Sequence, residues 1–202
     1  MPPSRRDFAE QGERKMAISY SYNSNYFPST FTGGDLEDLL LAFQDVGVDG
    51  EHPANTGGFY TNGVSSGLSG DTYAFANTGT NFAFSAVGDL AYNFSAHALY
   101  GTLQQLTLGG GLNADGTVSS AFITFDFGTT PLVATAAEGR DNAVHDVIWG
   151  LMNGSVEGAT DSAGTPNDGG LLAVLDAAGL LDDVIVTTGS AAFSESELLL
   201  AA

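Results

Sequence analysis

The chain has 202 residues, a formal net charge of −19 at pH 7 and no cysteine. The charge argues against binding to nucleic acid, because almost no basic residues are present to neutralise a phosphate backbone. Without cysteine, the chain can form neither disulfides nor thiolate metal sites. No stretch approaches the roughly 18 consecutive apolar residues of a membrane-spanning helix, so we expect no insertion into a membrane.

The basic residues are concentrated at the N-terminus. Residues 1–15 hold four of the five, whereas residues 16–202 carry 21 acidic residues and Arg140 as their one basic residue. Residues 1–15 lack the apolar stretch of a secretory signal, and we interpret them as an extension outside the fold. The hydrophobic content of 43% predicts one compact domain over residues 16–190. Its acidic surface repels other copies, so we expect mainly monomers.

The first predicted elements are a strand and a helix. Residues 17–27, AISYSYNSNYF, alternate between polar and apolar side chains with the period of two that is typical of a strand. In GDLEDLLLAFQDVG, the apolar residues between Leu36 and Phe43 recur at helical spacing, and Asp35 precedes them as a candidate N-cap. We therefore predict a helix that begins after Asp35.

A block of strands follows this helix. Turn-forming pairs such as Asn62-Gly63 punctuate the region, and short connections of this kind join neighbouring antiparallel strands. The block therefore predicts an antiparallel sheet. Its period-two stretches are residues 72–77, 81–92, 97–109 and 119–128.

Two further helices are predicted after the strands. RDNAVHDVIWGLMNG offers Asp141 or Asn142 as an N-cap, an apolar stripe at helical spacing, and Gly154 as the end of the helix. GGLLAVLDAAGLLD predicts a third helix over residues 169–182. A helix, a block of strands and then helices are typical of an α+β fold with the helices packed on one face of the sheet.

The motifs argue against several kinds of site. Neither G-x-S-x-G nor H-E-x-x-H occurs, which argues against the hydrolases that use these motifs. The glycine-rich turns match neither the β-roll repeat nor the twelve-residue calcium loop, so ordinary turn chemistry explains them better. A zinc site assembled from His52, His97 and His145 is an alternative that depends on the tertiary fold.

One local arrangement points to specific chemistry. GDLAYNFSAHALYG places Tyr92 and His97 on either side of a predicted four-residue hairpin tip, residues 93–96. Cross-strand Cβ atoms lie about 4.5–5.5 Å apart, so the phenol and the imidazole would be within hydrogen-bonding reach. An imidazole that accepts the phenolic proton makes tyrosinate accessible to ferric iron, and tyrosinate is a known axial ligand of haem. An aromatic–histidine pair that only packs on a half-buried sheet is the alternative.

These segments together resemble the HasA-type haemophores, secreted haem-scavenging proteins of Gram-negative bacteria. The motifs occur in the family's order over nearly all of residues 16–202. The resemblance implies an α+β domain with a curved antiparallel sheet on one side and helices on the other. It also implies one haem b held between two loops at one end, and a binding protein rather than an enzyme. The motifs are AISYSYNSNY, FQDV…NTGGFY, GDLAYNFSAHALYGTLQQLTLG, GRDNAVHDVIWGLMNG and ELLLAA.

The resemblance implies roles for individual residues. Tyr92 matches the axial iron ligand of the family, and His97 matches the histidine that hydrogen-bonds to that ligand. His145, Trp149 and Met152, at i, i+4 and i+7 of the predicted helix, would share the edge that lines the haem pocket. For His145, a buried structural histidine is the alternative, and for Trp149 and Met152 the alternative is plain core packing.

The loop that carries the second axial histidine departs from the family pattern. The family reads F-G-D-V-N-H, whereas FQDVGVDGEH places Val48 at the histidine position and His52 four residues later. Either His52 reaches the iron from a remodelled loop, or Tyr92 binds the iron alone. We favour a site in which Tyr92 is unassisted or only weakly assisted. The interval between Tyr92 and His97 is also shorter than in the family, which predicts a tighter tip.

The resemblance also implies partners and a location. Residues 191–202, which include SESELLLAA, resemble the uncleaved C-terminal signal that family members present to an ABC exporter, so we expect a secreted, extracellular protein. A frayed terminal helix is the alternative for this segment. Family members deliver haem to an outer-membrane haemophore receptor. The competing hypothesis is a secreted adhesin or surface-layer module, with a structural role and calcium in its turns.

Overall fold

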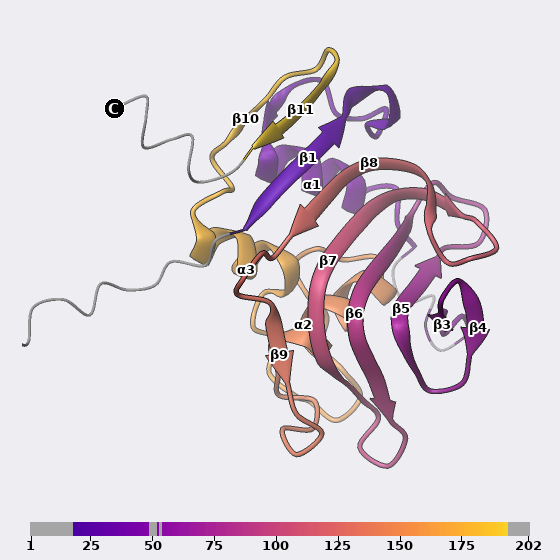
Figure 1. Ribbon diagram of the computed structural model, residues 1–202. Coiled ribbons are helices and arrows are strands. Elements are labelled where there is room, and N and C mark those ends of the chain that lie inside the picture. The colour runs from indigo at the N-terminus through magenta and orange to yellow at the C-terminus, as the bar shows by residue number, and fades with distance from the viewer. Residues whose placement is uncertain (1–17, 49–51, 53, 194–202) are drawn as a thin grey trace, which may run out of the picture.

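The computed structural model describes residues 18–48, 52 and 54–193. The predicted N-terminal extension, residues 1–15, and residues 194–202 of the predicted export signal lie outside the described residues. Over these residues the fold is α+β, as predicted: one large antiparallel sheet, a small two-stranded sheet and three α-helices. In Figure 1, the large sheet is strongly curved, and the helices lie on one side of it.

The large sheet has nine strands, and eight of them follow the spatial order β11-β1-β8-β7-β6-β5-β3-β4, while β9 pairs with β7 outside this path. The small sheet pairs β2 (Gly34–Asp35) with β10 (Val184–Ile185). The strands of the large sheet are β1 (Ser19–Asn23), β3 (Gly58–Thr61), β4 (Val64–Ser66), β5 (Ser69–Ala76), β6 (Ala83–Asn93), β7 (Ala98–Leu112), β8 (Val118–Asp126), β9 (Leu132–Ala134) and β11 (Ser190–Phe193).

The first helix begins where its cap predicts. In α1 (Leu36–Gln44), the Asp35 carboxylate accepts a hydrogen bond from the Asp38 N–H at 2.9 Å. The Asp38 carboxylate accepts one from the Asp35 N–H in return, which completes a capping box. Two of the N–H groups that the first turn of a helix leaves unpaired are satisfied in this way.

The other two helices differ from expectation in detail. Of the two candidate caps, Asn142 caps α2 (Ala143–Met152), because its side-chain oxygen accepts from the His145 N–H at 2.8 Å. The third helix, α3 (Gly170–Ala178), is shorter than predicted at both ends. It stops at Gly179, which has a φ of 71° and turns the chain out of the helix although apolar residues continue beyond it.

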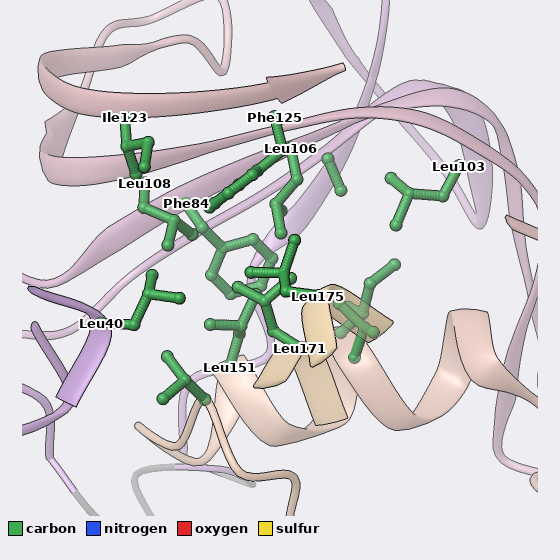
Figure 2. Packing of buried hydrophobic residues seen from close by; sticks show 14 of the residues in the cluster. Leu40, Phe84, Leu103, Leu106, Leu108, Ile123, Phe125, Leu151, Leu171 and Leu175 are labelled. Atoms are coloured by element: carbon green, nitrogen blue, oxygen red, sulfur yellow. The ribbon is translucent and has the colours of Figure 1, made fainter. Parts of the chain in front are cut away.

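The hydrophobic core lies between the sheet and the helices. Figure 2 shows Phe84, Leu106 and Phe125 of the sheet pointing toward Leu151 of α2 and Leu175 of α3. All five of these side chains are fully buried. Burial of each such side chain contributes roughly 1.5–3 kcal/mol, so this layer holds α2 and α3 firmly against the sheet.

The long hairpin of β6 and β7 bends at a bulge. The pairing register shifts between Val87 and Gly88. Gly88 has a φ of 154°, a backbone conformation in which residues other than glycine are strained. A Cβ atom at Gly88 would also collide with the carbonyl oxygen of Thr102 on β7. A bulge bends a strand and increases its twist, so Gly88 contributes to the curvature seen in Figure 1.

The sequence did not predict the short strands β3, β4 and β9, although it marked the turn between the first two. Asn62 and Gly63 have φ values of 52° and 73°, as a tight turn between antiparallel strands requires. Within the described residues, no helix is both long enough and apolar enough to cross a membrane.

Candidate functional site

The tip of the β6–β7 hairpin differs by one residue from the prediction. Asn93 pairs with Ala98 and Tyr92 with Leu99, so the four tip residues are 94–97 rather than 93–96. His97 therefore belongs to the turn, where it has a φ of 50°. The Asn93 side chain shapes this turn, because its Oδ1 accepts hydrogen bonds from the N–H groups that follow, at Ser95 and Ala96.

Despite this shift, Tyr92 and His97 are hydrogen-bonded. The distance between Tyr92 Oη and His97 Nδ1 is 2.8 Å. In the tautomer that carries its proton on Nε2, His97 accepts this bond and the phenol donates it. Burial raises the pKa of Tyr92, and the positive charge of Arg140 opposes that rise. The phenol is therefore neutral at pH 7, and a ligand that favours phenolate would find an acceptor for the proton in place.

Tyr92 and His97 lie on the wall of a cavity of about 450 Å³. This volume is within the range typical of small-molecule sites. Segments far apart in the sequence form the wall, including the loop before β3, the β6–β7 tip and α2. Six of the predicted site residues line this one cavity: His52, Tyr92, His97, His145, Trp149 and Met152.

The α2 helix divides its residues between the cavity and the core. His145, Trp149 and Met152 line the cavity along one edge, as their spacing predicts. The neighbouring stripe of Val144, Ile148 and Leu151 is fully buried in the core. A single helix therefore supplies a wall of the site and an anchor for it.

Comparison with known proteins relates this sequence and fold to one family. The profile of the family described as Heme-binding protein A (HasA) matches residues 16–195. The hemophore HasA of Serratia marcescens is 36% identical over 160 residues, which cover 73% of this chain and 80% of that protein. The chain belongs to the HasA family.

Solved structures of HasA proteins share the fold. The holo structure of the hemophore HasA from Yersinia pestis has a TM-score of 0.60 and 25% identity, and covers 83% of this chain and 92% of its own. An apo structure of the same hemophore has a TM-score of 0.59 and 24% identity, and covers 82% of this chain and 90% of its own. The predicted family and fold class are confirmed, and HasA proteins are haem carriers rather than enzymes.

Where the HasA pattern has its second histidine, this chain has a different arrangement. Val48, included among the predicted site residues, does not line the cavity; its N–H donates to Asn77 Oδ1 at 2.9 Å and its backbone packs against Gly154. His52 does line the cavity, and its ring meets the Trp149 ring edge-on at a centroid distance of 4.6 Å. Val48 therefore lies beside Gly154, in the turn after α2, whereas His52 is the residue that lines the cavity.

Three ring nitrogens at this wall have no hydrogen-bond partner among the residues that the structure describes. They are His52 Nδ1, His145 Nε2 and Trp149 Nε1, all of them buried. Burial also lowers the pKa of His52, which keeps its imidazole neutral and able to bind a metal at neutral pH. Buried polar atoms without partners are uncommon in proteins and call for an explanation such as a ligand.

The same wall does not form a metal centre from protein groups alone. Within the part of the chain that the structure describes, no three His, Asp or Glu side chains are grouped closely enough to hold an ion. The zinc alternative for His52, His97 and His145 is therefore wrong. These histidines surround a space for a larger ligand.

Among the wall residues that sequence analysis missed, two make contacts that hold the β6–β7 hairpin. Leu68, in the β4–β5 turn, accepts a hydrogen bond at its backbone oxygen from the Tyr92 N–H at 2.8 Å, which holds the β6 side of the hairpin. No sequence signal marks this contact, because it joins the β4–β5 turn to β6 through the backbone. The other is Arg140. It is the one basic residue after residue 15, and this feature of the sequence could have identified it.

His145 is held in one protonation state. It is 4% exposed, and its Nδ1 accepts a hydrogen bond from the Leu99 N–H at 3.2 Å, which places the proton on Nε2. Burial, with a contribution from the positive charge of Arg140, lowers the pKa of His145 to about 4, while Asp161 opposes the shift. The imidazole is therefore neutral in the folded protein.

This lowered pKa predicts a dependence of stability on pH. Between about pH 6.5 and pH 4 the unfolded chain binds a proton at His145 that the folded chain does not, so the free energy of unfolding falls as the pH falls. The loss should be on the order of 3 kcal/mol across this window. Urea unfolding of the haem-free protein at pH 7, 5.5 and 4 would measure it, with His145→Gln beside the wild type. Parallel pH profiles for the two proteins would contradict the prediction.

Proposed function

We propose that this protein captures haem b outside the cell and delivers it to an outer-membrane haemophore receptor for iron acquisition. One observation carries the proposal: Tyr92 Oη lies 2.8 Å from His97 Nδ1 on the wall of a cavity of about 450 Å³, in a member of the HasA family. Phenolate is an axial ligand of haem iron in other proteins. We assign Tyr92 as the iron ligand and His97 as the acceptor of its proton.

The residues present fit such a ligand. When bound, haem supplies a ferric iron, a Lewis acid that favours phenolate over phenol. His97 Nδ1 accepts the proton that Tyr92 Oη gives up, so charge is not left uncompensated in a partly buried site. Phe59, Leu68 and Met152 provide apolar wall against which the porphyrin faces would be removed from water.

The same cavity holds the candidate second ligand. His52 is neutral and lines the same cavity as Tyr92, and its buried Nδ1 has no hydrogen-bond partner within the described part of the chain. The alternative is a site in which Tyr92 is the one protein ligand. We favour the Tyr92-only or weakly assisted site, with His145, Trp149 and Met152 as wall contacts of the porphyrin.

Delivery requires export. We propose that residues 191–202 are the signal that an ABC exporter recognises and that the protein acts in the extracellular medium, mainly as a monomer. The acidic main segment, with 21 acidic residues over residues 16–202, supports this by disfavouring self-association and contact with anionic membranes.

A haemin titration followed by visible absorption tests the function. We expect a Soret shift that saturates at one haemin per chain. In the His52→Ala variant, an unchanged spectrum would assign the iron to Tyr92 alone, whereas a change in spin state would assign His52 as the second ligand. Absence of saturable haemin binding by the wild type, together with a melting temperature that rises with calcium, would contradict the proposal and favour the adhesin alternative.

A further inference from the structure

The one basic residue of the main segment is built into the cavity wall. Arg140 lies between β9 and α2 and lines the cavity with Tyr92 and His97, and its side chain is only 18% exposed. Withdrawing a guanidinium from water is costly unless its donors are well paired. The contacts of Arg140 therefore indicate what it does.

Arg140 bridges two segments that are distant in the sequence. Its Nε donates to the carbonyl oxygen of Ala96, at the hairpin tip, at 3.0 Å. Its Nη1 pairs with Oδ2 of Asp161, in the loop before α3, at 2.9 Å. The planar guanidinium can satisfy both acceptors at once because its donors point in fixed directions. We refer to Arg140 and Asp161 as the clamp.

Asp161 is a rigid anchor for the clamp. Its side chain is 3% exposed, and it accepts hydrogen bonds from the N–H groups of Ala163 and Thr165, at 2.8 and 3.0 Å, and from the Thr165 hydroxyl at 2.7 Å. Burial alone would raise the pKa of Asp161, but these bonds and Arg140 hold it well below its usual range. The carboxylate therefore stays charged and fixed, and so orients the guanidinium.

The bond to Ala96 acts on the next residue. The peptide bond between Ala96 and His97 precedes the φ angle of His97, which is 50°. Residues other than glycine adopt this conformation at a cost in free energy. A donor on the Ala96 carbonyl holds that peptide plane and with it the direction of the imidazole. Leu99, beyond the turn, is held separately. Asn142 Nδ2 donates to its backbone oxygen, and its N–H donates to His145 Nδ1, both at 3.2 Å.

We propose that Arg140, oriented by Asp161, is a positioning residue that holds the hairpin tip so that the His97 imidazole stays hydrogen-bonded to the Tyr92 phenol before any ligand arrives. This inference rests on the proposed function, because a preformed pair is useful only if Tyr92 binds iron. A site that is ordered in advance loses less conformational entropy on binding.

The test uses Arg140→Gln and Asp161→Asn. Asp141→Asn is the matched control, since it neutralises an exposed acidic residue beside Arg140 that is outside the clamp. In haem-free, isotope-labelled protein, the ¹⁵N signals of the His97 imidazole report its hydrogen bond directly. We expect both clamp variants to shift His97 Nδ1 toward the signal of a solvent-exposed imidazole, while Asp141→Asn keeps the wild-type signal.

A second measurement follows the haem. In the haem-loaded proteins, transfer to apomyoglobin should be about tenfold faster for both clamp variants, the size of effect seen when groups that orient metal ligands are removed. The iron–phenolate stretch in resonance Raman spectra should shift as well, which a purely structural role for Arg140 would not cause. Arg140→Lys keeps the charge but lacks the planar fork, so it should only partly restore the wild-type values.

The two proposals can fail separately. Wild-type His97 signals in both clamp variants would overturn the role of Arg140, whether or not the protein binds haemin. Failure of the wild type to bind haemin would overturn the proposed function, and the haem-free spectra would still decide whether Arg140 positions His97. If Arg140→Gln does not fold, Arg140→Lys and Asp161→Asn decide the matter, and an unchanged His97 signal in both would contradict the inference.

Discussion

Tyr92→Phe should abolish tight haem binding while leaving the fold intact. The change removes one oxygen, the proposed iron ligand, and keeps the aromatic ring on the cavity wall. We expect the haem dissociation constant to rise about a thousandfold, which corresponds to about 4 kcal/mol. The loss of its hydrogen bond to His97 should lower the free energy of unfolding by only about 1 kcal/mol. Haemin titration and urea unfolding of the same preparation measure the two effects.

Tyr100→Phe is the matched control for this change. Tyr100 lies on the same hairpin, opposite Ala91, but packs on the core rather than lining the cavity. It should bind haemin as the wild type does. His97→Ala should be intermediate, with affinity lower by about 10- to 100-fold, because it removes the proton acceptor but leaves the ligand. Wild-type affinity in Tyr92→Phe would show that another residue holds the iron.

Gly88→Ala should strongly destabilise the β6–β7 hairpin. The new methyl group would collide with the Thr102 carbonyl oxygen, and the backbone would be held at a φ of 154°. We expect the free energy of unfolding to fall by about 3–5 kcal/mol. For a chain of this size, each kcal/mol lowers the melting temperature by about 2–4 °C, so the midpoint should fall by about 10 °C. Thermal unfolding of the haem-free protein, followed by circular dichroism, measures this.

Gly79→Ala separates the two causes. Gly79 also has a positive φ, 80°, but a Cβ atom there would meet no atom within 4 Å. Gly79→Ala should therefore lower the free energy of unfolding only by the cost of the backbone conformation, about 1–2 kcal/mol. Equal losses in the two variants would mean that the bulge yields to the methyl group and that close packing of β6 on β7 does not depend on Gly88.

The parts of the site that were predictable are those encoded by short-range spacing. The five-residue separation of Tyr92 and His97 was enough to predict that the two side chains lie close together, because a hairpin brings its two arms into reach of each other. The hydrogen bond forms, although His97 lies in the turn rather than opposite Tyr92. The spacing of His145, Trp149 and Met152 similarly predicted one edge of a helix. The assignment of these residues to haem came from the order of the motifs and their resemblance to a family.

The parts that were not predictable depend on contacts between distant segments. The exact tip depended on the positive φ of His97, which the Asn93 side chain and the Arg140 bond to Ala96 support together. Sequence spacing could not show that Val48 packs against Gly154 while His52 reaches the cavity. The short strands β3, β4 and β9 exist because the sheet beside them offers backbone partners, and their own sequences carry little signal.

By itself, the sequence determined the α+β class, the cap of α1, a choice of two caps for α2, and the proximity of Tyr92 and His97. These features follow from periodicity and capping, which act over a few residues and need no knowledge of the remaining chain. The tertiary structure alone decided that one cavity collects all three histidines and that Arg140 joins the tip to Asp161. Such contacts are set by how the sheet curves and how the helices pack on it, because packing brings together residues that no local pattern connects.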